Sequence, residues 1–396
     1  MISSIRLQSK CQSRGKAPLR LVYLVSLGFR YLCALHVGIT LLIWSRDIRK
    51  RNMNIVAFDT KEFRRGREKT FFVPIGVSLR IDDEGEFKAN YDAAFNEISP
   101  KFRFDRKRKV YSTYELIGKL GLPKTIAFIE AIFSHIQNLI KQMVVYYTIL
   151  PPTKVPSVRE YGAEGSGVKE VGTLKFLTEL NPYYVYCCAW RYAQTELRLQ
   201  EKLLLDNFGG KITDAWIELS RMYGEKLQVY PHGDRCNPFI SAADMMVALL
   251  DFRLYRNKKR LDSEGIISVF SDASFDVVPM FIGQPHLSKL SPRTNRMIDV
   301  SANFKRPIIF ILLEELELMR LKAVRKIFES SPLMDSILNK AFEMDCGVKF
   351  FDSTLDSTTI RDGDIFVCLG SKAKATAEYI KNMYNIEILS RENLQP

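Results

Sequence analysis

Short apolar runs separated by turn residues are the main pattern of the chain after Met53. The run Asn54–Asp59 ends in an acid and predicts a buried strand. After a basic stretch, Phe71–Ile81 predicts a second strand. The residues Asp83-Glu84-Gly85 have turn chemistry, and Glu86–Tyr91 after them predicts the return strand of a hairpin. Three strands are therefore expected at the start of this region.

Helical and strand patterns then alternate. Pro123 opens a predicted helix that runs to Ile140, with apolar residues on one face, and two prolines stop the apolar strand Met143–Leu150. Residues 151–172 are rich in Pro, Gly and charge and predict a long loop. The later predictions are helices within Leu174–Gln200, a strand Lys202–Asp206, a helix Ile212–Met222, a strand Lys226–Tyr230 and a helix Phe239–Tyr255. This order predicts an α/β fold, with a mixed sheet whose later strands are joined by helices.

The pattern restarts after about residue 262. The predicted strands are Ile266–Phe270, Val277–Ile282, Ile308–Leu313, Val348–Phe351 and Ile365–Leu369, and the predicted helices are 314–329, 333–344 and 371–384. We therefore expect three parts: a leader over 1–52, an α/β domain over 53–260 and a second, smaller α/β domain over 261–396, whose role the sequence does not indicate.

Composition indicates a globular protein, and charge adds little to that. Of the 396 residues 46% are hydrophobic, and the net charge is +13. Residues 1–53 contain ten Lys or Arg and one acid, so most of this charge lies in the leader and the remainder of the chain carries only +4. The seven cysteines form no Cys-x-x-Cys pair, which favours a reducing, cytoplasmic location and argues against a structural zinc site.

The leader has two interpretations. Leu21–Trp44 is strongly apolar, but Arg30 interrupts it, and a central arginine costs roughly 2.5–3.5 kcal/mol on membrane insertion. In one interpretation, the segment is a membrane anchor or an uncleaved signal, and a membrane is then a partner. In the interpretation that we favour, translation starts at Met53 and the leader is spurious upstream sequence.

Three aspartates carry the chemical prediction. Asp59 ends the first predicted strand, Asp206 ends a later one, and Asp244 lies on the packed face of the helix Phe239–Tyr255. Strand ends at one edge of a parallel region come close together. Each aspartate alone also fits a structural role as a loop cap, a turn residue or a helix-dipole partner. Together they predict an acidic cluster that binds Mg²⁺ or Mn²⁺, which take oxygen ligands.

The segments around these aspartates resemble the RNase H-like superfamily. The strand-terminal Asp59 before a hairpin, Leu-Leu-Leu-Asp206-Asn-Phe-Gly-Gly and Ser241-Ala-Ala-Asp244-Met-Met-Val-Ala carry the resemblance. It covers residues 53–256 and is closest to an uncharacterised prokaryotic group that closes with an Ala-Asp helix, with the Piwi nuclease domain as a more distant cousin. The resemblance implies an RNase H-like mixed sheet flanked by helices and divalent-metal phosphodiester cleavage, with Asp59, Asp206 and Asp244 as catalytic and metal-binding residues.

One position departs from that family. Many members have Glu or Ser after the first Asp, whereas Thr60-Lys61-Glu62 follows Asp59 here. The fourth acid is then Glu62, Glu86 or Asp234, and we expect Asp234, which follows the strand Lys226–Tyr230, to be the fourth metal ligand.

A basic segment predicts contact with nucleic acid. Arg103, Arg106, Lys107, Arg108 and Lys109 alternate with aromatic residues, as in proteins that bind a phosphate backbone and stacked bases, although an ordinary solvated surface has the same composition. Gly162–Lys169 resembles a phosphate loop, but no Ser or Thr follows Lys169, so neither an NTPase nor a small organic cofactor is expected.

Three functions fit these observations. The first is a metal-dependent nuclease that acts on DNA or RNA, between which the sequence does not decide. The second is a catalytically inactive RNase H-like protein that binds nucleic acid or serves as a scaffold. The third is a membrane-tethered α/β protein of unrelated function, which requires the leader to be present in the mature protein.

Overall fold

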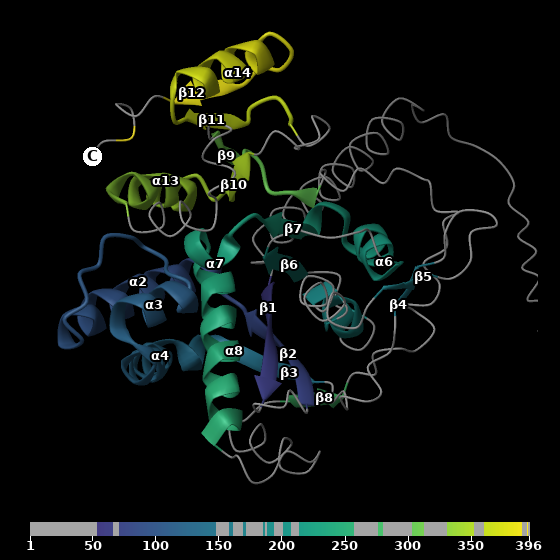
Figure 1. Ribbon diagram of the computed structural model, residues 1–396. Coiled ribbons are helices and arrows are strands. Elements are labelled where there is room, and N and C mark those ends of the chain that lie inside the picture. Colours follow the sequence, from purple (N-terminus) through teal and green to yellow (C-terminus); the bar gives the residue numbers. More distant parts are fainter. Residues whose placement is uncertain are drawn as a thin grey trace, which may run out of the picture. The chain divides into compact units, whose positions relative to one another are not determined.

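The computed structural model in Figure 1 describes most of the chain after residue 53. The described residues are 54–65, 71–147, 158–160, 169–171, 185–186, 188–193, 201–206, 214–256, 276–279, 303–312, 331–351, 360–389 and 394. The chain divides into two compact units, Met1–Asn52 and Met53–Pro396. The predicted leader and the Gly-rich segment 162–168 lie outside the described residues, and so do the predicted strand 266–270 and helix 314–329.

A six-stranded mixed sheet positions the three aspartates. Its strands in spatial order are β7 (Leu227–Tyr230), β6 (Glu201–Asp206), β1 (Asn54–Arg65), β2 (Phe71–Ile81), β3 (Ile140–Tyr147) and β8 (Asp276–Pro279). The central hairpin β1–β2 is antiparallel, and β3 is antiparallel to β2. On the other side of β1, strands β6 and β7 run parallel to it. A mixed α/β sheet is therefore confirmed.

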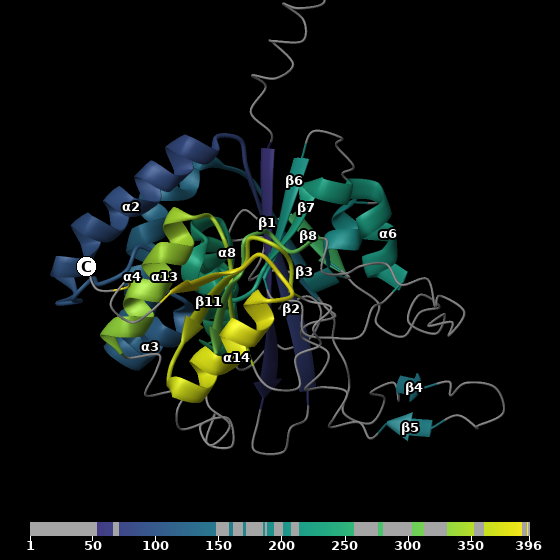
Figure 2. The same cartoon turned by 90° about the horizontal axis from the view of Figure 1, so that it is seen from above.

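Strand alternation divides the core into two layers. Ile55 and Ala57 of β1 pack against helices on one face, while Val56 and Phe58 pack on the other. The first face carries α2 (Glu84–Lys101), α3 (Thr113–Leu120), α4 (Leu122–Ile136) and α8 (Pro238–Arg256). The second face carries α6 (Asp214–Tyr223) and the helical residues 185–186 and 188–193. Figure 2 shows α2, α4 and α8 on one side of β1 and α6 on the other.

The predicted strand Glu86–Tyr91 is wrong, because this segment belongs to α2. The Asp83 carboxylate caps the helix by accepting a hydrogen bond from the Glu86 backbone N–H at 2.8 Å. The buried residues of α2 recur at helical spacing over its whole length: Phe87, Tyr91, Ala94, Phe95 and Ile98. Over six residues that spacing resembled strand alternation, and the cap resembled a turn. The hairpin of the structure is instead β1 with β2.

The prediction that Asp59 ends its strand is also wrong. Strand β1 continues to Arg65, paired with β2, and only its parallel pairing with β6 stops at Phe58. Of the other described elements before residue 256, those that match their predictions within a few residues are β2, α4, β3, β6, α6, β7 and α8, whereas α3 and α7 were not predicted. Within the predicted loop 151–172, the segments Val158–Glu160 (β4) and Lys169–Val171 (β5) form a two-stranded antiparallel sheet.

The C-terminal region has its own sheet. Its four parallel strands, in the order β10 (Val348–Phe351), β9 (Ile309–Leu312), β11 (Ile365–Cys368) and β12 (Glu387–Leu389), are accompanied by α13 (Pro332–Glu343) and α14 (Ser371–Lys381). A second α/β layer was predicted, except for β12. The predicted strand Val277–Ile282 is β8, which pairs with β3 of the first sheet, so that sheet extends past residue 260.

Backbone contacts join the C-terminal region to β7 and to the loop after it. The Val348 N–H donates to the Pro231 carbonyl at 2.8 Å, and the Lys305 N–H donates to the Val229 carbonyl at 3.1 Å. A Cβ on Gly347 would lie 2.2 Å from the Pro231 side chain, so only glycine allows this approach. Among the helices in the described ranges, none has the length and apolar character needed to cross a membrane.

Candidate metal centre

The strand register places Asp59 beside Asp206. Phe58 pairs with Leu205 in the parallel ladder, so the next residue of each strand is an aspartate. Because successive side chains alternate between faces, Asp59 shares the face of Ala57, and Asp206 shares the face of Leu204. Both of these apolar residues belong to the core layer under α8. The two carboxyls therefore leave the sheet on the same side, toward α8.

Helix α8 supplies the third carboxyl. The Asn237 side chain caps its start by accepting hydrogen bonds from the N–H groups of Phe239 at 3.0 Å and Ile240 at 3.2 Å. Ala243 and Val247 are buried, so the helix lies close to the sheet, and β1 and β2 are its contacts there. The Asp244 carboxylate accepts a hydrogen bond from the Thr113 N–H at 2.6 Å, which fixes its orientation.

A glycine in the loop after β7 supports the second carboxyl. The Gly233 N–H donates to the Asp206 carboxylate at 2.5 Å. A Cβ on Gly233 would lie 2.5 Å from the Ile240 side chain, 2.9 Å from Tyr230 and 3.2 Å from the Asp206 carboxylate. Only glycine fits this close approach, which also sets the position of Asp234 in the short helix α7 (Gly233–Cys236).

The four aspartates interact electrostatically. Burial raises the pKa of Asp59 well above its ordinary value, and repulsion from Asp244, Asp206 and Asp234 raises this pKa further. Burial, and then the Asp206 charge, raise the pKa of Asp234, against the opposing effect of the Arg235 guanidinium. The pKa of Asp244 is also raised by burial. The three predicted ligands and the acid expected as the fourth are thus near enough to affect one another electrostatically.

Asp59 interacts most strongly with Asp244. Among the neighbouring carboxylates, the charge of Asp244 raises the pKa of Asp59 most. In the part of the chain that the structure describes, no three His, Cys, Asp or Glu side chains already form a group that could hold a metal ion. Binding by three of these aspartates therefore requires side-chain rotation.

The other two candidates for the fourth acid lie elsewhere or are not described. Glu86 is an exposed residue in the first turn of α2, where its backbone N–H is bound to Asp83. The Glu62 side chain lies outside the described residues, although its backbone belongs to β1. Asp234, the candidate that we preferred from the sequence, is the one that interacts with the cluster.

Sequence reasoning missed an ion pair next to the cluster. The Lys61 ammonium lies 3.1 Å from the Asp251 carboxylate, which joins β1 to α8. The signal was present in the spacing, because Lys61 follows Asp59 by two strand positions and Asp251 follows Asp244 by two helical turns. Neither spacing shows by itself that the strand and the helix meet.

Only part of the basic segment 103–109 is exposed to solvent. Arg108 is 2% exposed and forms ion pairs with Glu115 at 2.7 Å and Asp335 at 2.9 Å. Arg106 is bound to the side chains of Asp92 and Asn96 and to backbone carbonyls. In the structure, these two arginines therefore stabilise the fold through intramolecular contacts.

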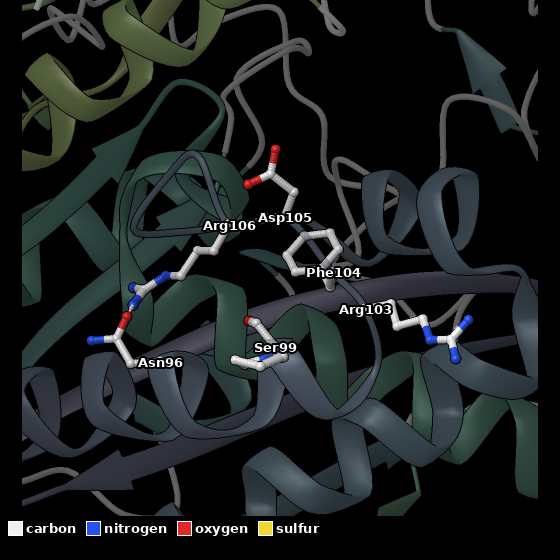
Figure 3. A pocket seen from close by; sticks show the side chains of 7 residues that line it. Asn96, Ser99, Arg103, Phe104, Asp105 and Arg106 are labelled. Atoms are coloured by element: carbon white, nitrogen blue, oxygen red, sulfur yellow. Dashed lines mark hydrogen bonds between the residues drawn. The ribbon is translucent and has the colours of Figure 1, made fainter.

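The remaining basic residues of that segment are exposed. Arg103, Lys107 and Lys109 reach solvent, although the Lys109 ammonium also lies 3.2 Å from the Asp92 carboxylate. Beside them is an open pocket of about 480 Å³ lined by Asn96, Ser99, Pro100, Arg103, Phe104, Asp105 and Arg106. In Figure 3 the Arg106 guanidinium meets Asn96, whereas the Arg103 side chain extends away from both.

Comparison with known proteins gives a family without an assigned function. The sequence matches the family described as Domain of unknown function (DUF8203) over residues 56–301. It is also similar to an uncharacterized protein of Archaeoglobus fulgidus, with 26% identity over 332 residues that cover 82% of this chain and 94% of the relative. The matched range includes the whole six-stranded sheet from Val56 onward and all four aspartates. The chain belongs to the DUF8203 family.

Proposed function

We propose that the chain is a divalent-metal-dependent nuclease that hydrolyses phosphodiester bonds of nucleic acid. Asp59, Asp206 and Asp244 would hold Mg²⁺ or Mn²⁺, with Asp234 as a fourth ligand. One observation carries the proposal: the Asp59 carboxyl lies among three other carboxyls. Within the described ranges, no lysine or arginine nitrogen lies at ion-pair distance from Asp59, Asp234 or Asp244.

The energetics of burial support a cation at this position. An uncompensated carboxylate at low dielectric is unfavourable, and several together repel each other. A divalent cation removes the repulsion and competes with protons for these carboxylates. Four carboxylates are the hard oxygen ligands that Mg²⁺ and Mn²⁺ prefer.

Backbone N–H groups orient the proposed metal ligands. The N–H groups of Thr60, Thr113 and Gly233 donate to Asp59, Asp244 and Asp206 respectively, at 2.7, 2.6 and 2.5 Å. These bonds orient the three carboxylates. A bound ion supplies activation of the attacking water and stabilisation of the leaving oxygen.

The RNase H-like resemblance is part of the proposal. It is supported by the antiparallel pair β1–β2 that contains Asp59, by the parallel strand that delivers Asp206, and by the helix that carries Asp244 along β1. A nucleic-acid partner is likewise proposed, with Arg103, Lys107 and Lys109 as the exposed residues of the basic segment. The thiols of Cys236, Cys346 and Cys368, which form no disulfide within the described residues, support a cytoplasmic location.

A second candidate is a catalytically inactive protein of the same fold that binds nucleic acid or acts as a scaffold. The raised pKa values of Asp59 and Asp244 favour it, because protonated carboxyls can persist without any metal. The two candidates differ in metal dependence and in the effect of removing one carboxylate.

Cleavage by the full chain tests the proposal. Labelled single- and double-stranded DNA, RNA and hybrid are offered with Mg²⁺, with Mn²⁺ or with EDTA, using wild type, Asp59→Asn and Asp244→Asn. The matched control is Asp362→Asn, an exposed aspartate in the C-terminal region. Cleavage that needs metal, vanishes in both cluster variants and persists in the control is expected. Cleavage unchanged in the cluster variants contradicts the proposal, and binding without cleavage selects the second candidate.

A further inference from the structure

Lys61 lies on the same strand and the same face as Asp59. Strand β1 pairs with β2 at this position, where Lys61 faces Ile75 across the ladder. Since strand residues two apart point to the same side of a sheet, the Lys61 side chain leaves toward α8, as Asp59 does. The parallel neighbour β6 has already ended its pairing at Leu205, so this part of β1 lies beyond the edge where the carboxyls gather.

The helix repeats the same spacing. Asp244 and Asp251 are two helical turns apart and therefore lie on one face of α8. Asp251 lies 3.1 Å from the Lys61 ammonium, and Asp244 is the carboxylate that most affects Asp59. The strand pair Asp59 and Lys61 thus faces the helix pair Asp244 and Asp251.

The exposure of the pair leaves the ammonium accessible. The side chain of Lys61 is 38% exposed, whereas that of Asp251 is 20% exposed. A partly exposed ion pair contributes little to the free energy of unfolding, typically below about 1 kcal/mol. Stability is therefore a weak reason for a lysine at this position. A fixed positive charge beside a cluster of carboxylates has a chemical use, because a phosphate group bound there carries negative charge that increases in the transition state.

We propose that Lys61 is a further catalytic residue of the nuclease, whose ammonium contacts a nonbridging oxygen of the phosphate undergoing hydrolysis, and that Asp251 is its positioning residue. This inference rests on the proposed function. In the reaction a bond forms between the water oxygen and phosphorus, and the bond from phosphorus to the leaving oxygen breaks. The water loses a proton to solvent, and the leaving oxygen gains one. Lys61 stays protonated throughout and supplies only charge.

Binding and cleavage by the full chain separate this inference from the proposed function. Binding of a labelled oligonucleotide is measured by fluorescence anisotropy in Ca²⁺ over a range of salt, and cleavage is measured in Mg²⁺. The variants are Lys61→Met, Lys61→Arg, Asp251→Asn and the double variant Lys61→Met/Asp251→Asn. The control is Lys88→Met, which removes the same charge from the ion pair with Glu84, at 2.7 Å on α2.

The expected result for Lys61→Met is a fall in kcat of about 10- to 100-fold, together with a salt-dependence slope of binding reduced by about one. Lys61→Arg restores part of kcat, and Lys88→Met is unchanged. Asp251→Asn lowers kcat less than Lys61→Met does and has no additional effect in the double variant, because it acts through Lys61. An independent loss in the double variant overturns the positioning role.

Other outcomes show whether the inference about Lys61 or the proposed nuclease function is wrong. If wild type binds but does not cleave, and Lys61→Met still weakens binding and reduces the salt slope, the phosphate contact stands and the nuclease proposal falls. If Lys61→Met binds and cleaves as wild type does, the inference is overturned while the nuclease stands. If wild type binds no oligonucleotide, both are overturned.

Discussion

Two regions of the protein contain buried carboxylates, and the regions differ in the groups that surround these carboxylates. Asp364, in the turn before β11, is fully buried, and its carboxylate accepts hydrogen bonds from the N–H groups of Ile308 and Arg361, both at 2.9 Å. The Arg306 guanidinium lies 2.5 Å from the same carboxylate. In the acidic cluster, Asp59 is surrounded by Asp244, Asp206 and Asp234 instead.

The difference lies in where the compensating charge comes from. The charge of Asp364 is neutralised within the fold by Arg306. Burial raises the pKa values of Asp59, Asp234 and Asp244, and repulsion from neighbouring carboxylates raises those of Asp59 and Asp234 further. Buried acids of the first kind stabilise the fold, and acids of the second kind mark a place that is completed by a cation.

The largest expected difference between the two regions is in catalysis. Asp206→Asn removes a proposed ligand and should lower cleavage by at least about 100-fold, because activation of the water depends on the bound ion. Asp364→Asn should leave the rate per folded molecule unchanged. Initial cleavage rates, normalised to the folded fraction from circular dichroism, check this. An equal loss of rate in both variants would break the comparison.

The next largest expected effect is on stability, and here the C-terminal region is the one that should be affected. Asp364→Asn leaves Arg306 without its carboxylate and should lower the free energy of unfolding by about 3 kcal/mol. Urea denaturation measures the change. The matched control is Asp362→Asn, since Asp362 is exposed and accepts a hydrogen bond from the Asn385 N–H at 2.8 Å. If the two variants lose the same stability, the buried pair is not what holds this region.

A glycine substitution tests how the cluster is assembled. In Gly233→Ala the new methyl group would contact Ile240, Tyr230 and the Asp206 carboxylate, so we expect a loss of about 1–3 kcal/mol. Gly118→Ala on α3 meets nothing within 4 Å and should stabilise the protein by about 0.5–1 kcal/mol. Thermal denaturation compares the two. A neutral Gly233→Ala would mean that the loop after β7 is less tightly packed than described.

The smallest expected effect is a gain. Because burial and repulsion raise the pKa of Asp59 in the folded protein, the folded state binds protons more tightly than the unfolded chain there. Stability from this group is therefore lost as the pH rises through the two pKa values, and the full penalty applies above the folded value. Without metal at high pH, Asp59→Asn should gain about 1 kcal/mol. Urea denaturation in EDTA at several pH values checks this, and a loss at all of them would contradict repulsion.

Much of the cluster could be predicted from local sequence. Strand β6 and helix α8 follow from their apolar spacing, and both place an aspartate at the edge of the apolar pattern. The predictions that failed did so because the sequence window was too short or because the partner residue lies far away in the sequence. Six residues of α2 imitated a strand until its full helical period was considered. The inward turn of Arg106 and Arg108 depends on Asp92 and Asp335, which local charge patterning does not connect to them.

The longer reach of β1 and the Lys61–Asp251 ion pair have the same origin. Strand β1 continues past Asp59 because β2 supplies a partner as far as Arg65, and only the sheet shows this. Asp251 meets Lys61 because α8 lies along β1. Tertiary pairing fixes both, so periodicity within either segment alone does not reveal them.

Calorimetric titration of the full chain with Mn²⁺ tests the central claim most directly. Wild type, Asp59→Asn and Asp364→Asn are titrated at neutral pH after treatment with EDTA and its removal. The account predicts that Mn²⁺ binds wild type with release of protons from the Asp59–Asp244 pair, that Asp364→Asn binds equally well, and that Asp59→Asn loses at least about tenfold in affinity. Mn²⁺ binding that is equal in Asp59→Asn and wild type, or absent from wild type, would contradict it.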